Sequence, residues 1–332
     1  MKHSNVALFV PNNGCPHRCS FCNQRSITGK LSQPTPNDVA EAARIAKKSL
    51  GERTKNAEIA FFGGSFTAVE RGYMVSLLEA ASPFLRDGSF AGIRISTRPD
   101  AIDPEILAVL KRYGVTAIEL GAQSMDDRVL ALNGRGHTAA QVEEASRQIR
   151  AGGFSLGLQM MTGLYGSTPE KEMRTARKLA ALFPDTVRIY PTVVLRGTEL
   201  GNRYLAGAYR PPELEATVDL CADLLDFFEE KGITVIRLGL HASKELERDR
   251  LAGPWHPAFR ELCESRRLLL KIKAELEREG RPPGSLRIHV NPSGASIAAG
   301  QKKSNLAALC EAGFPARIVP DETVERGRFF IE

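Results

Sequence analysis

The sequence predicts an α/β fold, a partial (β/α)6 TIM-like barrel with a small α+β extension at its C-terminal end. Two observations carry this prediction. Short runs of apolar and β-branched residues alternate with segments of helical periodicity, as in repeated βαβ units. The runs are continuous rather than alternating, which indicates parallel strands that are buried on both faces.

Six of these runs are predicted to form the strands, over 5–10, 58–62, 92–97, 116–121, 154–161 and 186–192. Helices are predicted between them, over 36–50, 69–84, 103–113, 139–152 and 168–183, and the first opens on a Pro-Asn-Asp start signal. A barrel of such units places its active site at the carboxyl ends of the strands. A doubly wound open sheet is the alternative.

The pattern changes near residue 250. A long helix is predicted over 211–231 and a seventh strand over 233–240, at the edge of the barrel. Residues 253–258 then carry two prolines and a glycine, and a charged helix over 257–279 and a βαββ-like tail follow. We therefore predict a barrel domain over 1–250 and a small α+β domain over 251–332.

Composition is that of a globular protein, with 42% hydrophobic and 25% charged residues among 332. No apolar run approaches the ~18 residues of a membrane span, and the N-terminal residues lack a signal-peptide pattern, so we expect a cytoplasmic protein without a membrane partner. The net charge of +6 is modest. Residues 1–30, however, contain Lys2, Arg18, Arg25 and Lys30 and no acidic residue, so this stretch is expected to attract anions.

The predicted C-terminal domain has two groups of cations, which are Arg266, Arg267, Lys271 and Lys273 on the charged helix and the pair Lys302 and Lys303. Such groups suit a phosphate backbone. Because Glu275, Glu277 and Glu279 dilute the charge of the helix, an ordinary solvated face is favoured.

Three of the six cysteines crowd into one loop after the first strand, where Cys15, Cys19 and Cys22 have the spacing C-x3-C-x2-C. A disulfide framework is not expected in a chain of this length. Three thiolates so close together can each bind one iron of a cubane cluster and leave the fourth iron open to a small molecule. A zinc site with His17 as fourth ligand is the alternative, but chelation by a residue between two of the cysteines would be cramped.

The second predicted strand ends in a glycine pair, Gly63 and Gly64, followed by Ser65. Glycines at this position let the backbone approach a ligand closely, because they have no Cβ and tolerate a positive φ. A tight strand-to-helix turn with no ligand is the alternative interpretation.

The cysteine spacing, with the aromatic Phe21 just before the last cysteine, resembles the signature of the radical S-adenosylmethionine (SAM) superfamily. The resemblance implies a [4Fe-4S] cluster on Cys15, Cys19 and Cys22, with SAM as the second cofactor. It also implies reductive cleavage of SAM to a 5′-deoxyadenosyl radical, with electrons from a ferredoxin- or flavodoxin-like donor. The protein would supply enclosure and orientation.

Over about residues 5–245 the chain is similar to the radical-SAM domain of the Elongator catalytic subunit, and more loosely to oxygen-independent coproporphyrinogen dehydrogenase. The similar motifs are 96–100, 121–124, 135–138, 190–192 and 196–198. The resemblance implies a set of SAM-binding residues, which is Phe21, Gly63, Gly64, Ser65, Ser96, Gln123, Arg135 and Gln159. Within it, the glycines would hold the SAM amino group, Gln123 the ribose and Arg135 the carboxylate.

Three departures limit the likeness. The cysteine spacing is shorter than in the Elongator subunit, and Ser96 stands where many relatives carry a glutamate. Nothing after residue 250 resembles an acetyltransferase domain. The Elongator-like motifs and the basic cysteine loop make a tRNA base the first substrate hypothesis, and the looser dehydrogenase likeness makes a porphyrinogen or other small carboxylated metabolite the second. A nonenzymatic Fe–S or zinc binding protein is the alternative of a different class.

Overall fold

The computed structural model describes residues 4–11, 15, 19–23 and 32–332. The chain divides into two compact units. The first contains Met1–Pro212 and Phe228–Pro254, and the second contains Glu213–Phe227 and Trp255–Glu332.

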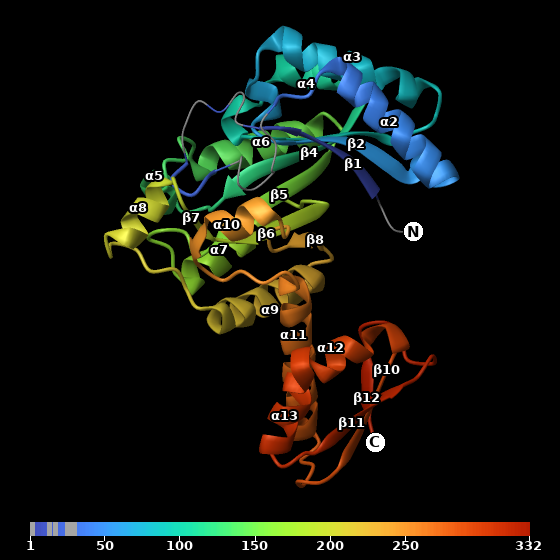
Figure 1. Cartoon of the computed structure of the whole chain (residues 1–332), viewed down its shortest axis with the longest axis vertical. Helices are drawn as coiled ribbons and strands as arrows, with labels where there is room; N and C mark the ends of the chain where they lie inside the picture. The colour runs from blue at the N-terminus through green and yellow to red at the C-terminus, as the bar shows by residue number, and fades with distance from the viewer. Residues whose placement is uncertain (1–3, 12–14, 16–18, 24–31) are drawn as a thin grey trace. The chain divides into compact units, whose positions relative to one another are not determined.

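The first unit is built on a seven-stranded sheet of order β1-β2-β3-β4-β5-β6-β8, in which every neighbouring pair is parallel. Its strands are β1 (Ser4–Val10), β2 (Ala57–Gly63), β3 (Gly92–Thr97), β4 (Val115–Gln123), β5 (Ser155–Thr162), β6 (Thr186–Pro191) and β8 (Thr234–Leu238). The sheet curls into a half-barrel (Figure 1), which confirms the predicted partial barrel with its seventh edge strand. A two-stranded sheet of β7 (Val194–Leu195) and β9 (Arg250–Ala252) was not predicted.

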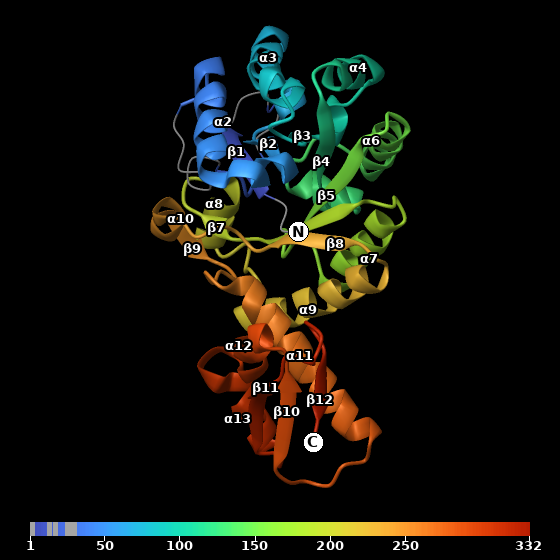
Figure 2. The ribbon, with the colours of Figure 1, turned by 90° about the vertical axis from the view of Figure 1, so that its right-hand side faces the viewer.

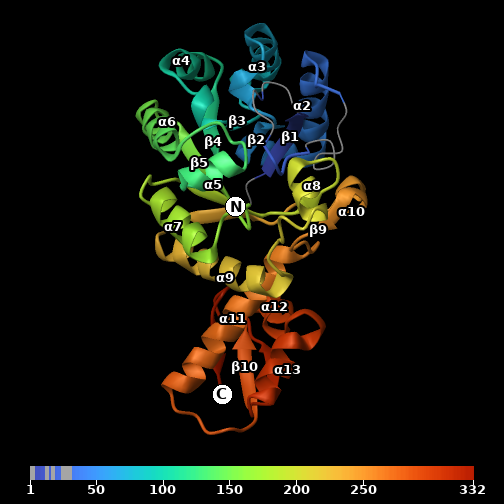
Figure 3. The same cartoon turned by 90° about the vertical axis from the view of Figure 1, so that its left-hand side faces the viewer.

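Helices lie between the strands along the chain, and Figures 2 and 3 show the longer ones among them along the outside of the curled sheet. They are α2 (Pro36–Leu50), α3 (Arg71–Arg86), α4 (Pro104–Arg112), α5 (Asp127–Leu132), α6 (Ala139–Ala151), α7 (Pro169–Ala180), α8 (Glu199–Leu205) and α10 (Lys244–Asp249). Short 3₁₀ turns are η1 (Gly51–Asn56), η2 (Phe66–Ala68) and η3 (Pro99–Ala101). Local sequence fixes the N-terminal ends of several helices. Thr35 and Asp38 form a capping box on α2, and Thr138 and Gln141 form one on α6.

The two faces of the sheet differ in chemistry. The outer face is apolar and fully buried, with residues such as Ile95, Ile118 and Leu158 at 1% exposure or less. The side chains of the inner face are polar or charged at Arg94, Glu119 and other positions. The expectation of strands that are apolar on both faces was therefore wrong for the inner face, because charged residues at alternate positions neutralise one another there.

The second unit contains the predicted βαββ-like tail. A three-stranded sheet has the order β11-β10-β12, with β10 parallel to β11 and antiparallel to β12. Its elements are α11 (Phe259–Arg278), β10 (Leu286–Val290), η4 (Pro292–Gly294), α12 (Ala295–Ala299), η5 (Gln301–Lys303), α13 (Ser304–Glu311), β11 (Ala316–Pro320) and β12 (Phe329–Ile331). Most of α9 (Leu214–Glu230) also belongs to this unit. Leu269 and Ile272 of α11 pack on Ile288 of β10 in its core.

Candidate active site

The cysteine loop is tied to the half-barrel at Ser20. The Ser20 backbone N–H donates to the Asn133 carbonyl at 3.0 Å, and the Ser20 hydroxyl donates to Asn133 Oδ1 at 2.9 Å. The Ser20 carbonyl accepts from Leu200 N at 2.8 Å. Both Ser20 and Asn133 are at most 1% exposed. The loop is thus anchored between α5 and α8, which brings Cys19 and Cys22 to the carboxyl ends of the strands.

Phe21 belongs to this anchor. Its ring packs against the buried cluster of Val194, Leu200 and Tyr209. Next to it, Cys22 N donates to the Cys19 carbonyl at 3.1 Å, so these two cysteines share one turn of chain. The aromatic residue of the motif therefore holds the loop in place through apolar contact.

Arg135 lies beside the cysteines. One guanidinium nitrogen, Nη1, is 3.1 Å from Cys19 Sγ, and the other, Nη2, donates to the Gly121 carbonyl at 2.6 Å. The residue is 6% exposed and has no carboxylate partner in the part of the chain that the structure describes. An exposed salt bridge at a helix entry, the ordinary use of an arginine here, is thus excluded.

Arg98 supports Arg135. Its guanidinium pairs with Asp100 at 2.9 and 3.0 Å, as the sequence permits, and also donates to the Arg135 carbonyl. His137 lies nearby and its Nε2 is 3.2 Å from the Ala122 carbonyl. Burial, with the charge of Arg135, lowers the pKa of His137 to about 4, so this imidazole is neutral near neutral pH. It acts as an anchor for the end of β4.

The glycine pair lies where the end of β2 contacts the end of β1. Gly63 has a φ of 110°, and a Cβ there would lie 3.1 Å from the Val10 carbonyl oxygen. Gly64 N donates to that same oxygen at 2.7 Å. The hydroxyl of the next residue, Ser65, lies 2.9 Å from Thr97 Oγ1 and accepts from Arg98 N at 3.2 Å. The pair therefore requires glycine at least at Gly63.

Gln123 ends β4 in a left-handed conformation, with a φ of 63°. Such a conformation is uncommon for a residue other than glycine. Within the described residues, three buried polar atoms at this edge have no hydrogen-bond partner, which are Gln123 Oε1, Arg135 Nε and His137 Nδ1. Buried polar atoms without partners are rare in native proteins, so their gathering here indicates a place for a polar ligand.

Ser96 of β3 and Gln159 of β5 lie close together on the inner face of the half-barrel. Gln159 Nε2 is 3.4 Å from Ser96 Oγ and 3.3 Å from Glu119 Oε2. Glu119 is 1% exposed and also pairs with Arg188 at 2.6 Å and with Arg94 at 3.3 Å. The two residues that were predicted to contact SAM are thus part of a charged network that sequence analysis did not predict.

The network continues to both sides of Glu119. Arg94 pairs with Glu58 at 2.6 Å. Arg188 lies over the ring of Phe62 and 3.4 Å from the Tyr190 hydroxyl, so Tyr190 faces the interior of the half-barrel. Arg188 and Tyr190 are two positions apart, as are Arg94 and Ser96, so the two side chains of each pair face the same side of the sheet. This alternation is the signal in the sequence that would have revealed the charged inner face.

The thiols fit an iron–sulfur cluster by their chemistry. Cys15 lies close enough to Cys19, Arg98 and Arg135 for their charges to act on it. Burial raises the pKa of the Cys15 thiol, whereas a backbone hydrogen bond from Ser65 and the two arginines oppose this rise. No three metal-ligating side chains among the described residues come together as a finished site. The segment 16–18, with His17 and Arg18, and the cations Arg25 and Lys30 lie outside the described residues.

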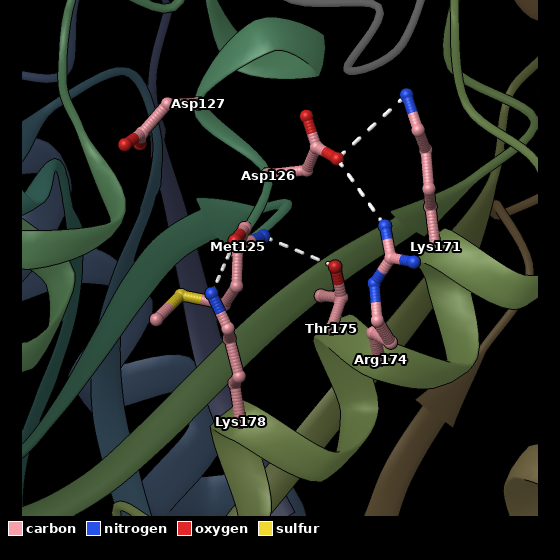
Figure 4. Close-up of a pocket in the computed structure, with 7 residues that line it drawn as sticks. All are labelled: Met125, Asp126, Asp127, Lys171, Arg174, Thr175 and Lys178. Atoms are coloured by element: carbon pink, nitrogen blue, oxygen red, sulfur yellow. Dashed lines mark hydrogen bonds and ion pairs between the residues drawn. The ribbon is translucent and has the colours of Figure 1, made fainter.

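A separate cavity of about 250 Å³ lies between the start of α5 and α7 (Figure 4). Asp126 there is approached by Lys171 Nζ at 3.7 Å and by Arg174 Nη2 at 3.6 Å, and Lys178 Nζ donates to the Met125 carbonyl at 3.1 Å. These cations thus bind groups of the protein itself, and the cavity is distinct from the cysteine loop.

The family model of the Radical SAM superfamily matches residues 9–179, and that of the Radical_SAM C-terminal domain matches residues 184–268. The chain therefore belongs to the radical SAM superfamily and is an enzyme of that class. The first match includes all three cysteines of the loop together with Gly63, Gly64 and Arg135. No helix of the described chain is long and apolar enough to cross a membrane.

Among curated relatives, the tRNA uridine(34) acetyltransferase of Dehalococcoides mccartyi is 27% identical over 252 residues, which cover 66% of this chain and 55% of that protein. Elongator complex protein 3 of Saccharomyces cerevisiae is 29% identical over 266 residues, which cover 66% of this chain and 47% of the relative. An uncharacterized protein of Methanocaldococcus jannaschii is 27% identical and is covered over 77% of its length. The chain thus spans about half the length of the two named relatives.

Among solved structures, the archaeal Elp3 of Methanocaldococcus infernus with an N-terminal deletion aligns with a TM-score of 0.57 and 19% identity, over 84% of this chain and 64% of that one. SuiB of Streptococcus suis aligns with a TM-score of 0.51 and 13% identity, over 73% of this chain and 50% of that one. At these identities the likeness shows the shared fold.

Proposed function

We propose that the enzyme reductively cleaves SAM at a [4Fe-4S] cluster held by Cys15, Cys19 and Cys22, and that a base in tRNA is the substrate. One observation carries the first part. The Arg135 guanidinium, the cysteine loop and the unpartnered amide oxygen of Gln123 meet at the carboxyl ends of β1–β4. When bound, the two cofactors together supply the radical that attacks an unreactive C–H bond.

The protein's own residues would bind SAM and orient it. Gly63 keeps the end of β2 in close contact with the Val10 backbone beside the cysteine loop, and Arg135 offers a planar fork to a carboxylate. Gln123 has an acceptor free for a hydroxyl group. Below this level, Gln159 and Ser96 line the polar inner face. All eight residues of the predicted SAM-binding set keep this assignment as part of the proposal.

The tRNA substrate rests on similarity. Relatives named tRNA uridine(34) acetyltransferase are similar to this chain over 66% and 65% of its length. Since this chain spans about half the length of these relatives, its own reaction on tRNA is a separate proposal. A donor of low potential, such as a ferredoxin or flavodoxin, belongs to the same proposal.

The test uses anaerobically reconstituted protein with dithionite and SAM, and measures 5′-deoxyadenosine and methionine by mass spectrometry. We expect both products, a large loss in Arg135→Gln, and no loss in Arg128→Gln, which changes an exposed arginine of α5. Absence of cleavage by cluster-loaded protein would refute the reaction. Stimulation by carboxylated metabolites and not by tRNA would refute the substrate.

A further inference from the structure

Residues 269–332 lie beyond both family matches, which end at 179 and 268. They form most of the second unit, in which α11, α12 and α13 lie on one side of the three strands (Figure 1). The strand β10 leads into two consecutive helices, and the chain returns in β11 parallel to β10. The turn between these helices, Gly300–Lys303, is the subject of the inference.

Gly300 makes the turn tight. Its φ is 77°, and a Cβ there would lie 2.5 Å from Ser304 Oγ and 2.7 Å from Asn305 N. No side chain fits into such space without a shift of the backbone. The Gly300 carbonyl then accepts from Lys303 N at 2.9 Å, which closes the turn.

Asn305 fixes the turn to the rest of the unit. The residue is 3% exposed, and its Nδ2 lies 3.0 Å from the Ser265 carbonyl and 3.2 Å from the Ala298 carbonyl. One buried amide thus joins α11, the end of α12 and the start of α13. The lysines of the turn are therefore displayed on a rigid support.

Lys302 and Lys303 both adopt left-handed backbone conformations, with φ values of 52° and 63°. Glycine or asparagine takes this conformation at lower cost, and two consecutive lysines in it are unusual. Both side chains are exposed. The sequence thus places two positive charges at positions where the backbone alone favours other residues.

These charges differ from those of α11. Arg266 pairs with Glu215 and Asp219, and Arg267 and Lys271 both pair with Asp226. For these three cations the solvated, ion-paired interpretation holds. Lys302 and Lys303, by contrast, have no carboxylate partner within the described chain. Residues 280–310 contain no aspartate or glutamate at all.

We propose that the Gly300–Lys303 turn binds the phosphate backbone of single-stranded RNA. Exposed lysines without a carboxylate partner, on a turn fixed by a buried amide, bind phosphates without reading sequence. By analogy of architecture alone, KH modules also grip the backbone of a single strand with a short glycine-containing turn. This inference deepens the proposed function and rests on its tRNA part, because an unpaired anticodon or loop is single-stranded RNA.

The test compares full-length variants by fluorescence anisotropy with a labelled oligouridylate of about 12 nucleotides and with tRNA, at several salt concentrations. In Lys302→Asn/Lys303→Asn the charges are lost, while asparagine keeps the left-handed backbone. We expect roughly tenfold weaker binding at low salt and a log–log salt slope reduced by about 1.4, for two lost phosphate contacts. Lys302→Arg/Lys303→Arg should bind like the parent.

A matched control is Lys47→Asn/Lys48→Asn, which removes two consecutive lysines from the regular helix α2. It should leave the salt slope unchanged. Equal losses in both double variants would show a mere effect of net charge and would overturn the inference. Parent-like binding by the 302/303 asparagine variant would overturn it as well, provided that thermal melting shows the variant folded.

The outcome separates this inference from the proposed function. If the parent binds tRNA and the asparagine variant does so equally well, only the turn is excluded. If the parent binds no RNA at low salt, both the turn and the tRNA substrate fail, whereas SAM cleavage without substrate still tests the radical chemistry. Cleavage should be equal in the parent and both lysine variants, because the turn lies in a separate unit from the cysteines.

Discussion

Ser20 and Asn133 are joined by two hydrogen bonds, one between backbones at 3.0 Å and one between side chains at 2.9 Å, although 113 positions separate them. Both side chains are buried, and Asn133 Nδ2 also donates to the Tyr165 carbonyl at 2.9 Å. The cysteine loop is thus held by a contact that neither the cysteine spacing nor the glycine pair predicts.

Ser20→Ala should loosen the loop. It leaves Asn133 Oδ1 as a buried acceptor without its partner, which costs about 1–3 kcal/mol. Because the loop contains the ligands, we expect iron to be lost to a chelator about tenfold faster, measured anaerobically by absorbance. Ser82→Ala removes a buried hydroxyl bonded to the Leu78 carbonyl in α3 and should not change the rate of iron loss. Equal rates for Ser20→Ala and the parent would show that the anchor does not control the loop.

Replacement of any one of Cys15, Cys19 or Cys22 by alanine should abolish the cluster. Three thiolates are needed to hold the cubane with one iron open. We expect about four irons and four sulfides per chain in the parent and few in each variant, by iron and sulfide analysis. Cys310→Ala, which removes an exposed cysteine of α13, should keep the cluster. Stoichiometric zinc without sulfide in protein purified without oxygen would instead support the zinc site.

Gly63→Ala should separate SAM binding from cluster binding. The new methyl group would lie 3.1 Å from the Val10 carbonyl at a φ of 110°, so the end of β2 must shift. We expect the cluster to be retained and SAM cleavage to fall at least tenfold. The control is Gly51→Ala. Gly51 also has a positive φ, of 56°, but a Cβ there would meet nothing within 4 Å, so this variant should cleave SAM like the parent. A fully active Gly63→Ala would reduce the pair to a turn.

Glu119→Gln should strongly destabilise the half-barrel. Arg188 would keep its charge but lose its carboxylate partner at 2.6 Å, at an almost fully buried site. We expect a loss of about 3–5 kcal/mol in the free energy of unfolding, measured by urea denaturation. The control Glu105→Gln breaks the exposed pair with Arg71 and should cost under about 1 kcal/mol. A change in Glu119→Gln no larger than in the control would show that the network does not support the fold.

The sequence predicts the order of the barrel elements well, because continuous apolar runs and helical periodicity are local signals. The predicted bounds of α2, 36–50, agree with the structure. The charged inner face was missed, since Glu58, Arg94 and Glu119 look like interruptions of apolar strands until the parallel register places them on the same face of the sheet. Contacts such as Arg98 to Arg135 depend on the three-dimensional meeting of strand ends, for which spacing alone has no signal.

Glu172 should make the stability of the barrel depend on pH in an unusual direction. Burial raises the pKa of this carboxyl group to about 7, although the Gly163 N–H at 2.6 Å and the Ser167 hydroxyl act against the rise. Between about pH 4.5 and 7 the folded chain therefore holds a proton here that the unfolded chain has lost. The stabilisation from this group is present below pH 4.5 and is lost as the pH rises through 7. It amounts to about 3 kcal/mol.

Glu172→Gln imitates the protonated group and keeps an acceptor for Gly163. The difference in unfolding free energy between variant and parent, measured in urea from pH 5 to 8, should increase with pH and favour the variant at pH 8. Glu170→Gln serves as the control, because hydrogen bonds hold the pKa of the exposed Glu170 carboxyl below its ordinary value, outside this range. A difference that stays constant from pH 5 to 8 would show that Glu172 is charged throughout in the folded chain.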